Sequence, residues 1–334
     1  MAKREFPLRM VAWELTRSCN LSCLHCRASA IKERDEQELT TDECKMVIDS
    51  ISSFSSPVII LTGGEPLLRN DIFEIISYAN ERGLYTVLAT NGTFISKEIA
   101  RTLKKLNIRR VSLSIDGKDS QSHDHFRGVN GSFEYIVNAA KIMKEENLPF
   151  QINTTVTYMN INDLENIYAL AISLGASAWH VFMLLPVGRG KNIKEKVLKA
   201  EEYEETLRLI YTLERKRELE IKVTCGPQYY RILKENGETL RSSGCLAGKS
   251  FMFISHTGVT QPCGYLEIPC GDVKTEGVEH VWKNSEVFLR LRDYSQYKGK
   301  CGRCRYLDIC GGCRARSYEE YGDFMEGEPY CTMP

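Results

Sequence analysis

Three cysteines lie within eight residues near the start of the chain, in Thr16-Arg-Ser-Cys19-Asn-Leu-Ser-Cys23-Leu-His-Cys26. This C-x3-C-x2-C spacing lets one short loop direct three thiolates at a single metal centre. Structural zinc sites and ordinary iron–sulfur clusters take four protein ligands. A [4Fe–4S] cluster held by these three thiolates therefore keeps one iron open. The alternatives are a disulfide with a spare thiol, or a zinc loop completed by His25, which lies too close to Cys26 to reach back easily.

Thirteen cysteines in 334 residues are the second constraint. Their number is odd, and the start, Met-Ala-Lys-Arg-Glu-Phe-Pro, lacks the apolar region of an export signal, so a disulfide scaffold is disfavoured. We expect metal binding in the reducing cytoplasm. No stretch approaches the roughly 20 apolar residues of a membrane span. The formal net charge of zero gives no support for binding nucleic acid or an anionic membrane.

Short apolar runs alternate with amphipathic segments from residue 9 to about 185. The runs are β-branched and too short for buried helices, so they predict parallel strands. They are Met10–Trp13, Pro57–Leu61, Tyr85–Ala89, Val111–Ile115, Phe150–Val156 and Trp179–Leu185. The intervening segments predict helices, with a capping box at Thr40-x-x-Glu43 and an N-cap at Ser96. From about Gly226, cysteines and glycines replace this rhythm, so we predict two domains, 1–215 and 216–334.

Six strand–helix units predict an α/β fold, either a partial (β/α)6 TIM-like barrel or a doubly wound open sheet. In both layouts ligand sites form at the carboxyl ends of the strands. The three-cysteine loop follows the first strand, and Thr62-Gly63-Gly64-Glu65-Pro66-Leu67 follows the second. Paired glycines let the backbone approach a ligand closely, although a tight strand–helix turn would need them too.

The three-cysteine loop followed by Gly63-Gly64-Glu65-Pro66 resembles the signature of the radical S-adenosylmethionine (SAM) enzymes. That resemblance implies that the open iron binds SAM and that Gly63, Gly64, Glu65 and Pro66 hold its amino group. Asn91, Ser114 and Asn153, at later strand ends, are similar to the family's SAM-contacting positions, with Ser114 and Asn153 near the ribose and methionine ends. Arg127 would meet the SAM carboxylate or be a solvated surface arginine.

A second cysteine set fills the last third of the chain: Cys245-x12-Gly258-x4-Cys263, Cys301-x2-Cys304-x5-Cys310-x2-Cys313 and Cys331. A zinc ribbon would also use paired Cys-x2-Cys. The order resembles the SPASM extension of radical SAM enzymes, which implies two auxiliary [4Fe–4S] clusters. By that resemblance one is held by Cys301, Cys304, Cys310 and Cys331, and most of the other by Cys245, Cys263 and Cys313. The family commonly has three residues where Cys310-x2-Cys313 has two. Cys225, Cys270 or an open iron completes the second cluster. Cys44 is expected to be a buried structural thiol.

Longer stretches, among them Trp13-Glu-Leu-Thr-Arg-Ser-Cys19, Ser56–Arg69, Cys225–Arg231 and Glu328-Pro-Tyr-Cys331, resemble the heme synthases of the siroheme-dependent pathway. The resemblance implies oxidative decarboxylation of two propionates of iron-coproporphyrin III to vinyl groups, giving heme b. It also implies an electron donor such as flavodoxin or ferredoxin, with an auxiliary cluster as electron outlet. The candidate partners for the propionates are Arg189, Lys191, Tyr229, Tyr230 and Arg231, and His180 and His256 are weaker candidates for an axial ligand.

Other functions fit parts of this pattern. A related radical SAM/SPASM maturase would act on another tetrapyrrole such as didecarboxysiroheme, on a peptide or on another cofactor. From other classes, an iron–sulfur electron carrier or a zinc-binding structural protein would also be cysteine-rich. The Gly-Gly-Glu-Pro motif disfavours a carrier, which has no use for a SAM pocket.

Overall fold

One ten-stranded sheet runs through the computed structural model, which describes residues 5–240 and 242–334. Its strand order is β10-β9-β8-β1-β2-β3-β4-β5-β6-β7, and strands β1 to β7 are parallel and stand in chain order. They are β1 (Met10–Glu14), β2 (Val58–Thr62), β3 (Tyr85–Ala89), β4 (Val111–Ser114), β5 (Phe150–Val156), β6 (Ala178–Met183) and β7 (Glu220–Thr224). A doubly wound sheet reverses its strand order, so the partial barrel is confirmed and the alternative is wrong. Residues 1–4, part of the start taken to lack an export signal, lie outside the described residues.

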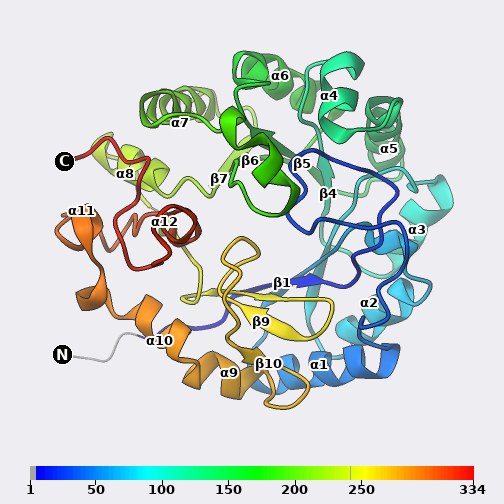
Figure 1. Ribbon diagram of the computed structural model, residues 1–334. Helices are drawn as coiled ribbons and strands as arrows, with labels where there is room; N and C mark the ends of the chain where they lie inside the picture. The colour runs from blue at the N-terminus through cyan, green and yellow to red at the C-terminus, as the bar shows by residue number, and fades with distance from the viewer. Residues whose placement is uncertain (1–4, 241) are drawn as a thin grey trace.

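Helices cover the outer side of these strands (Figure 1). They are α1 (Thr41–Phe54), α2 (Ile72–Glu81), α3 (Lys97–Lys105), α4 (Ser120–Arg127), α5 (Ser132–Glu145), α6 (Leu164–Leu174) and α7 (Ala200–Glu214). The predicted capping box is present, since Thr40 and Glu43 exchange side-chain and backbone hydrogen bonds. Ser96 caps α3 as predicted. The short polar helix α4 was not predicted.

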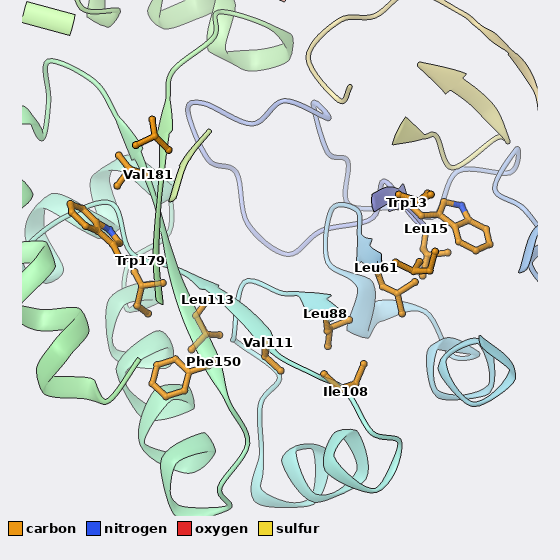
Figure 2. Packing of buried hydrophobic residues seen from close by; sticks show 14 of the residues in the cluster. Trp13, Leu15, Leu61, Leu88, Ile108, Val111, Leu113, Phe150, Trp179 and Val181 are labelled. Carbon is orange, nitrogen blue, oxygen red and sulfur yellow. The ribbon is translucent and has the colours of Figure 1, made fainter. Parts of the chain in front are cut away.

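Side chains alternate between the two faces of each strand. On the helix side, Trp13, Val111, Leu113 and Trp179 are fully buried in one hydrophobic cluster that also contains residues of the surrounding helices. Figure 2 shows these four side chains among other members of the cluster. Truncating one of these large side chains costs about 3–5 kcal/mol. The opposite, concave face carries half-buried side chains, which leaves the carboxyl ends of the strands available for a ligand site.

The C-terminal part joins the same sheet and extends across the open side of the partial barrel (Figure 1). Strand β8 (Phe251–Ile254) pairs parallel with β1, and β9 (Val259–Gln261) and β10 (Gly271–Asp272) follow antiparallel. The helices here are α8 (Gln228–Glu235), α9 (Val278–Asn284), α10 (Glu286–Arg292), α11 (Gly299–Gly302) and α12 (Arg314–Tyr321). Strand β7 continues the parallel sheet of the first predicted domain beyond residue 215. The domain boundary between residues 215 and 216 therefore stays a prediction. In the described part of the chain, no helix is long and apolar enough to cross a membrane.

Candidate active site and metal centres

The three-cysteine loop leaves the carboxyl end of β1, where Cys19 and Cys23 are buried and Cys26 is half-buried. Each sulfur accepts a hydrogen bond from nitrogen, which stabilises a thiolate. The donors are Leu21 N (3.4 Å) and Asn91 Nδ2 (3.7 Å) to Cys19, Arg127 Nη1 (3.6 Å) to Cys23, and Ala30 N (3.4 Å) to Cys26. Nitrogen donors of this kind would stabilise the three sulfurs as cluster ligands, against the burial that raises the pKa of Cys19 to about 11. His25 stacks on Phe126 with ring centroids 4.5 Å apart.

The paired glycines after β2 lie against the backbone of the three-cysteine loop. A Cβ atom on Gly63 would lie well under 3.0 Å from Thr16 O, and one on Gly64 equally close to Ser18 O. The backbone also bonds there, since Gly64 N donates to Thr16 O and Glu65 N to Ser18 O, both at 2.7 Å. The glycines therefore permit close contact between β2 and the loop. Their predicted contact with SAM stays a prediction.

Glu65 links the ends of β2 and β3. Its fully buried carboxylate accepts hydrogen bonds from Leu67 N (3.0 Å), Thr90 Oγ1 (2.8 Å) and Asn91 N (2.7 Å). Burial raises the pKa of Glu65 to about 7, and these hydrogen bonds oppose the shift. Because Asn91 also contacts Cys19, the carboxylate positions one side of the cysteine loop indirectly.

Arg127, at the end of α4, lies on the other side of the loop. It is only 8% exposed, so the alternative of a solvated surface arginine is wrong. Its guanidinium pairs with the buried Asp116 and donates to Cys23, while Asp116 accepts from Thr155 N at 2.6 Å. The ion pair holds a cation beside the cysteine sulfur. Contact with a SAM carboxylate stays a prediction.

Ser114, Asn153 and His180 form a row across three neighbouring strands on the concave face, because their positions pair in register. Gln151 contacts both Asn153 Oδ1 and His180 Nδ1 at 2.8 Å. Ser114 ends β4, but Asn153 is the fourth of the seven residues of β5, so its predicted place at a strand end is wrong. The register of β4 and β5 still places the two predicted SAM contacts side by side. The other histidine, His256, bonds Glu14 Oε1 (3.0 Å) and lies 3.3 Å from Asp35 Oδ2.

The five candidate substrate residues do not converge. Arg189 supports the cysteine loop, donating to Cys23 O (2.9 Å) and Ala30 O (2.7 Å). Tyr229 is buried and donates to Glu214, and Arg231, 3% exposed, pairs with glutamates 204 and 235. Burial raises the pKa of Tyr230. Lys191 lines a cavity of about 240 Å³ with Pro186, Lys194, Arg316, Glu319, Glu320 and Tyr330. These side chains have partners in the chain or lie apart, so their substrate roles stay predictions.

Four cysteines line a second cavity, which is bounded by α11 and the C-terminal segment. They are Cys301, Cys304, Cys310 and Cys331. The Cys301 sulfur accepts from Glu328 N (3.2 Å) and Arg314 Nη2 (3.4 Å), and the Cys304 sulfur from Tyr306 N (3.4 Å). This grouping matches the ligand set implied by resemblance, and the hydrogen bonds fit thiolates that carry charge.

A further group forms around Cys313. The hydrogen bond from Cys225 lowers the pKa of the Cys313 thiol to about 7. Burial raises the pKa of Cys263 to about 12, and the nearby charges of Cys245 and Cys313 add to that shift. Cys270 instead bonds Ile268 O at 3.5 Å and lies beside Ser285 and Arg292. Of the two candidates for the missing fourth ligand, Cys225 therefore lies with the set.

The short Cys310-x2-Cys313 spacing is closed by two left-handed glycines, Gly311 (φ +72°) and Gly312 (φ +59°). This conformation is costly for residues with a Cβ. The turn lets these two cysteines face different groups. Cys310 faces the cavity that Cys301, Cys304 and Cys331 also line, and Cys313 faces Cys225. The departure from the usual spacing is thus accommodated by Gly-Gly. Cys44 is buried in the main core, as expected of a structural thiol.

Sequence reasoning missed a contact between the two cysteine regions. Arg27, next to Cys26, pairs with Glu14 Oε2 (2.5 Å), donates to Gly264 O (3.3 Å) and lies 4.6 Å from the Phe253 ring centre. Gly264 follows Cys263. Two features of the sequence could have indicated this contact. Arg27 directly follows Cys26, and Glu14 is an acidic residue at the end of an apolar strand.

Two family models match the chain: the radical SAM superfamily over residues 13–171 and an iron–sulfur cluster-binding domain, SPASM, over residues 245–314. The first match contradicts the zinc loop at Cys19–Cys26, and the second contradicts the zinc ribbon. A structure of Streptococcus suis SuiB bound to S-adenosylmethionine superposes with a TM-score of 0.79, covering 98% of this chain and 78% of that one at 20% identity. At that identity the likeness shows the fold.

Curated relatives match nearly the whole chain. An AdoMet-dependent heme synthase from Nitratidesulfovibrio vulgaris is 44% identical, covering 97% of this chain and 92% of that protein. One from Methanosarcina barkeri is 42% identical, covering 97% and 96%. An Fe-coproporphyrin III synthase from the same archaeon is 31% identical, covering 97% and 88%.

Proposed function

Because the chain belongs to the AdoMet-dependent heme synthase family of radical SAM enzymes, we propose that it converts iron-coproporphyrin III to heme b. It is an enzyme of heme synthesis that acts on a tetrapyrrole by oxidative decarboxylation. The geometry that supports this most is the Arg27 contact, which links Cys26 to the strand end beside Cys263. A reaction that needs both a radical source and an electron outlet needs these two regions close together.

When bound, SAM and the reduced cluster supply a 5′-deoxyadenosyl radical. Cys19, Cys23 and Cys26 would hold that cluster and would leave one iron for SAM. The SAM amino group would be held by Gly63, Gly64, Glu65 and Pro66. Asn91 and Arg127 would position the cysteine sulfurs, and the ribose and methionine ends of SAM would lie near Ser114 and Asn153. Each propionate loses a hydrogen atom from its β-carbon, carbon dioxide and one electron. The auxiliary cysteines hold the clusters that receive this electron.

Physiological electrons come, in this proposal, from a small donor such as flavodoxin or ferredoxin. The oxygen-sensitive clusters and the thirteen free cysteines fit a cytoplasmic enzyme. Residues 1–215 carry the radical chemistry and residues 216–334 the auxiliary clusters.

The decisive test uses protein reconstituted without oxygen and mixed with SAM, dithionite and iron-coproporphyrin III. We expect 5′-deoxyadenosine and a porphyrin that has lost two equivalents of formic acid. Liquid chromatography–mass spectrometry measures both products. An unchanged porphyrin with 5′-deoxyadenosine formed would overturn this substrate and favour another tetrapyrrole, as the Fe-coproporphyrin III synthase relative suggests. A protein that holds its clusters but forms no 5′-deoxyadenosine would contradict the radical chemistry.

Cys225 completes the auxiliary cluster of Cys245, Cys263 and Cys313 in this proposal. We expect Cys225→Ser to lower the iron content or change the electron paramagnetic resonance (EPR) spectrum of one auxiliary cluster, because a thiolate ligand is lost. Cys270→Ser is the matched control, since Cys270 is a buried cysteine beside Ser285 and Arg292. If the control changed the cluster and Cys225→Ser did not, the assignment would be reversed.

Lys191 contacts a substrate propionate in this proposal. It is exposed and lines the 240 Å³ cavity, which Arg316 also borders. We expect Lys191→Ala to weaken tetrapyrrole binding about fivefold, as the loss of one exposed ion pair worth roughly 1 kcal/mol would. Fluorescence-quenching titration measures the affinity, with the exposed Lys105→Ala as control. Equal affinity in the two variants would remove Lys191 from the substrate site.

A further inference from the structure

Helix α12 begins directly after Cys313 and carries two buried arginines. Arg314 is 0% exposed and Arg316 2% exposed. Residues two apart on an α-helix point roughly 200° apart. The two guanidinium groups therefore lie on opposite sides of one helix. Arg316 meets the Cys225 and Cys313 group. Arg314 meets Cys301 and also lies near the charge of Cys245.

Arg314 faces the cavity lined by Cys301, Cys304, Cys310 and Cys331. Its Nη2 donates to the Cys301 sulfur at 3.4 Å, and its Nη1 donates to the carbonyls of Phe324 (3.0 Å) and Glu326 (2.7 Å). The Tyr297 ring centre lies 4.9 Å from the guanidinium carbon. These contacts fix a positive charge beside one ligand of this set.

Arg316 faces the Cys225 and Cys313 group. Its Nη2 donates to Cys225 O at 2.8 Å, and the guanidinium carbon lies 4.8 Å from the ring centre of Tyr203 and 4.9 Å from that of Tyr330. Its Nη1 pairs with Glu328 at 3.2 Å. These contacts fix a second positive charge beside the backbone of Cys225.

Glu328 joins the two groups. Its Oε2 accepts from Cys313 N at 2.6 Å, and its own backbone N donates to the Cys301 sulfur at 3.2 Å. The carboxylate is 1% exposed. This carboxylate pairs with Arg316. Arg314 instead donates to two backbone carbonyls and to the Cys301 sulfur.

We propose that Arg314 and Arg316 are positioning residues that set the reduction potentials of the two auxiliary clusters separately. This inference rests on the proposed function. A cluster with four thiolates gains one further negative charge on reduction, so a fixed buried cation stabilises the reduced form and raises the potential. Arg314 acts most strongly on the Cys301 cluster, because it donates a hydrogen bond to the Cys301 sulfur at 3.4 Å. Arg316 acts most strongly on the Cys225 cluster, because it donates to Cys225 O at 2.8 Å.

The electron that these clusters receive comes from the substrate. After loss of the β-hydrogen atom, the radical is on the β-carbon of the propionate, and the bond between the α-carbon and the carboxylate breaks. Carbon dioxide leaves, a vinyl double bond forms, and one electron passes to an auxiliary cluster, which is reduced. The cluster beside Arg316 is the acceptor, since its ligand Cys263 adjoins the Arg27 contact with the SAM-binding loop.

The test is a reductive titration of the reconstituted full-length enzyme, followed by EPR. We expect Arg316→Gln to move the midpoint of one auxiliary cluster to a more negative potential and Arg314→Gln to move that of the other. The midpoint of the cluster at Cys19, Cys23 and Cys26 should stay unchanged in both variants. The Arg→Lys variants keep the positive charge. Their midpoints should therefore stay close to those of the unchanged protein.

Three results would overturn the proposal: no shift, a shift of the same cluster in both variants, or equal shifts in the Lys and Gln variants. If a Gln variant fails to hold its clusters, Glu328→Gln replaces it. Removing this carboxylate should move the midpoint of the Cys225 cluster to a more positive potential. An unchanged or more negative midpoint would contradict the proposal. If the Gln variants show the expected midpoint shifts but the enzyme forms no heme, only the proposed function is contradicted. If the enzyme forms heme but the midpoints do not shift, only this inference is contradicted.

Discussion

Cys23→Ala is expected to abolish formation of 5′-deoxyadenosine. The loop offers three thiolates to the cluster, and two do not hold a [4Fe–4S] centre with an open iron in place. The loss also leaves the buried Arg127 without the sulfur that accepts its hydrogen bond. We expect reconstituted protein to lose about four irons per chain, the content of one such cluster. Iron analysis and mass spectrometry of the nucleoside product measure both effects.

The control for this variant is Cys44→Ala. Cys44 is equally buried, but it lies on α1 in the main hydrophobic core, where a free cysteine behaves as a small hydrophobe. Its removal should leave iron content and SAM cleavage unchanged. SAM cleavage that survived in Cys23→Ala would show that the loop does not carry the radical chemistry.

Gly64→Ala is expected to destabilise the protein by about 3 kcal/mol, at the upper end for overpacking. The added Cβ would overlap Ser18 O, a backbone atom that cannot rotate away. The hydrogen bond from Glu65 N to Ser18 O would break, and the cysteine loop would move away from β2. Chemical denaturation measures the stability, and iron content after reconstitution reports the position of the loop.

Gly83→Ala is the matched control, because nothing lies within 4 Å of a Cβ there. Its φ of +73° makes alanine unfavourable by about 1 kcal/mol. This variant should lose stability mildly and keep its iron. Equal iron contents in the two variants would contradict a role for Gly64 in placing the loop.

Local signals predicted most of the barrel. Strand β5 has the predicted bounds, and the caps at Thr40 and Ser96 are present, because β-branched runs and capping residues act within a few positions. Strand β7 was missed because only Ile221 and Val223 of its five residues face the core. Two apolar residues between charged ones do not distinguish a strand from a polar linker.

The partners of the site residues were not predictable from spacing. Arg27 and Gly264 are 237 positions apart, and Arg189 and Cys23 are 166 apart. The Gly188-Arg-Gly-Lys191 stretch looks like an exposed basic loop, and only the folded chain shows that Arg189 supports the three-cysteine loop. The cysteine groups were assigned by resemblance, and the geometry favours Cys225 over Cys270 because contacts, unlike spacings, report distance in space.

The pairing of β8 with β1 has a consequence for dissecting the protein. Strand β1, which leads into the cysteine loop, is an inner strand only because residues 251–254 cover its free side. A fragment that ends near residue 215 would expose that side as an unpaired edge of backbone N–H and C=O groups, a template for strand addition between copies. The N-terminal half is therefore expected to aggregate when produced alone, and a soluble reagent for studying SAM cleavage needs the auxiliary region even where its clusters are removed.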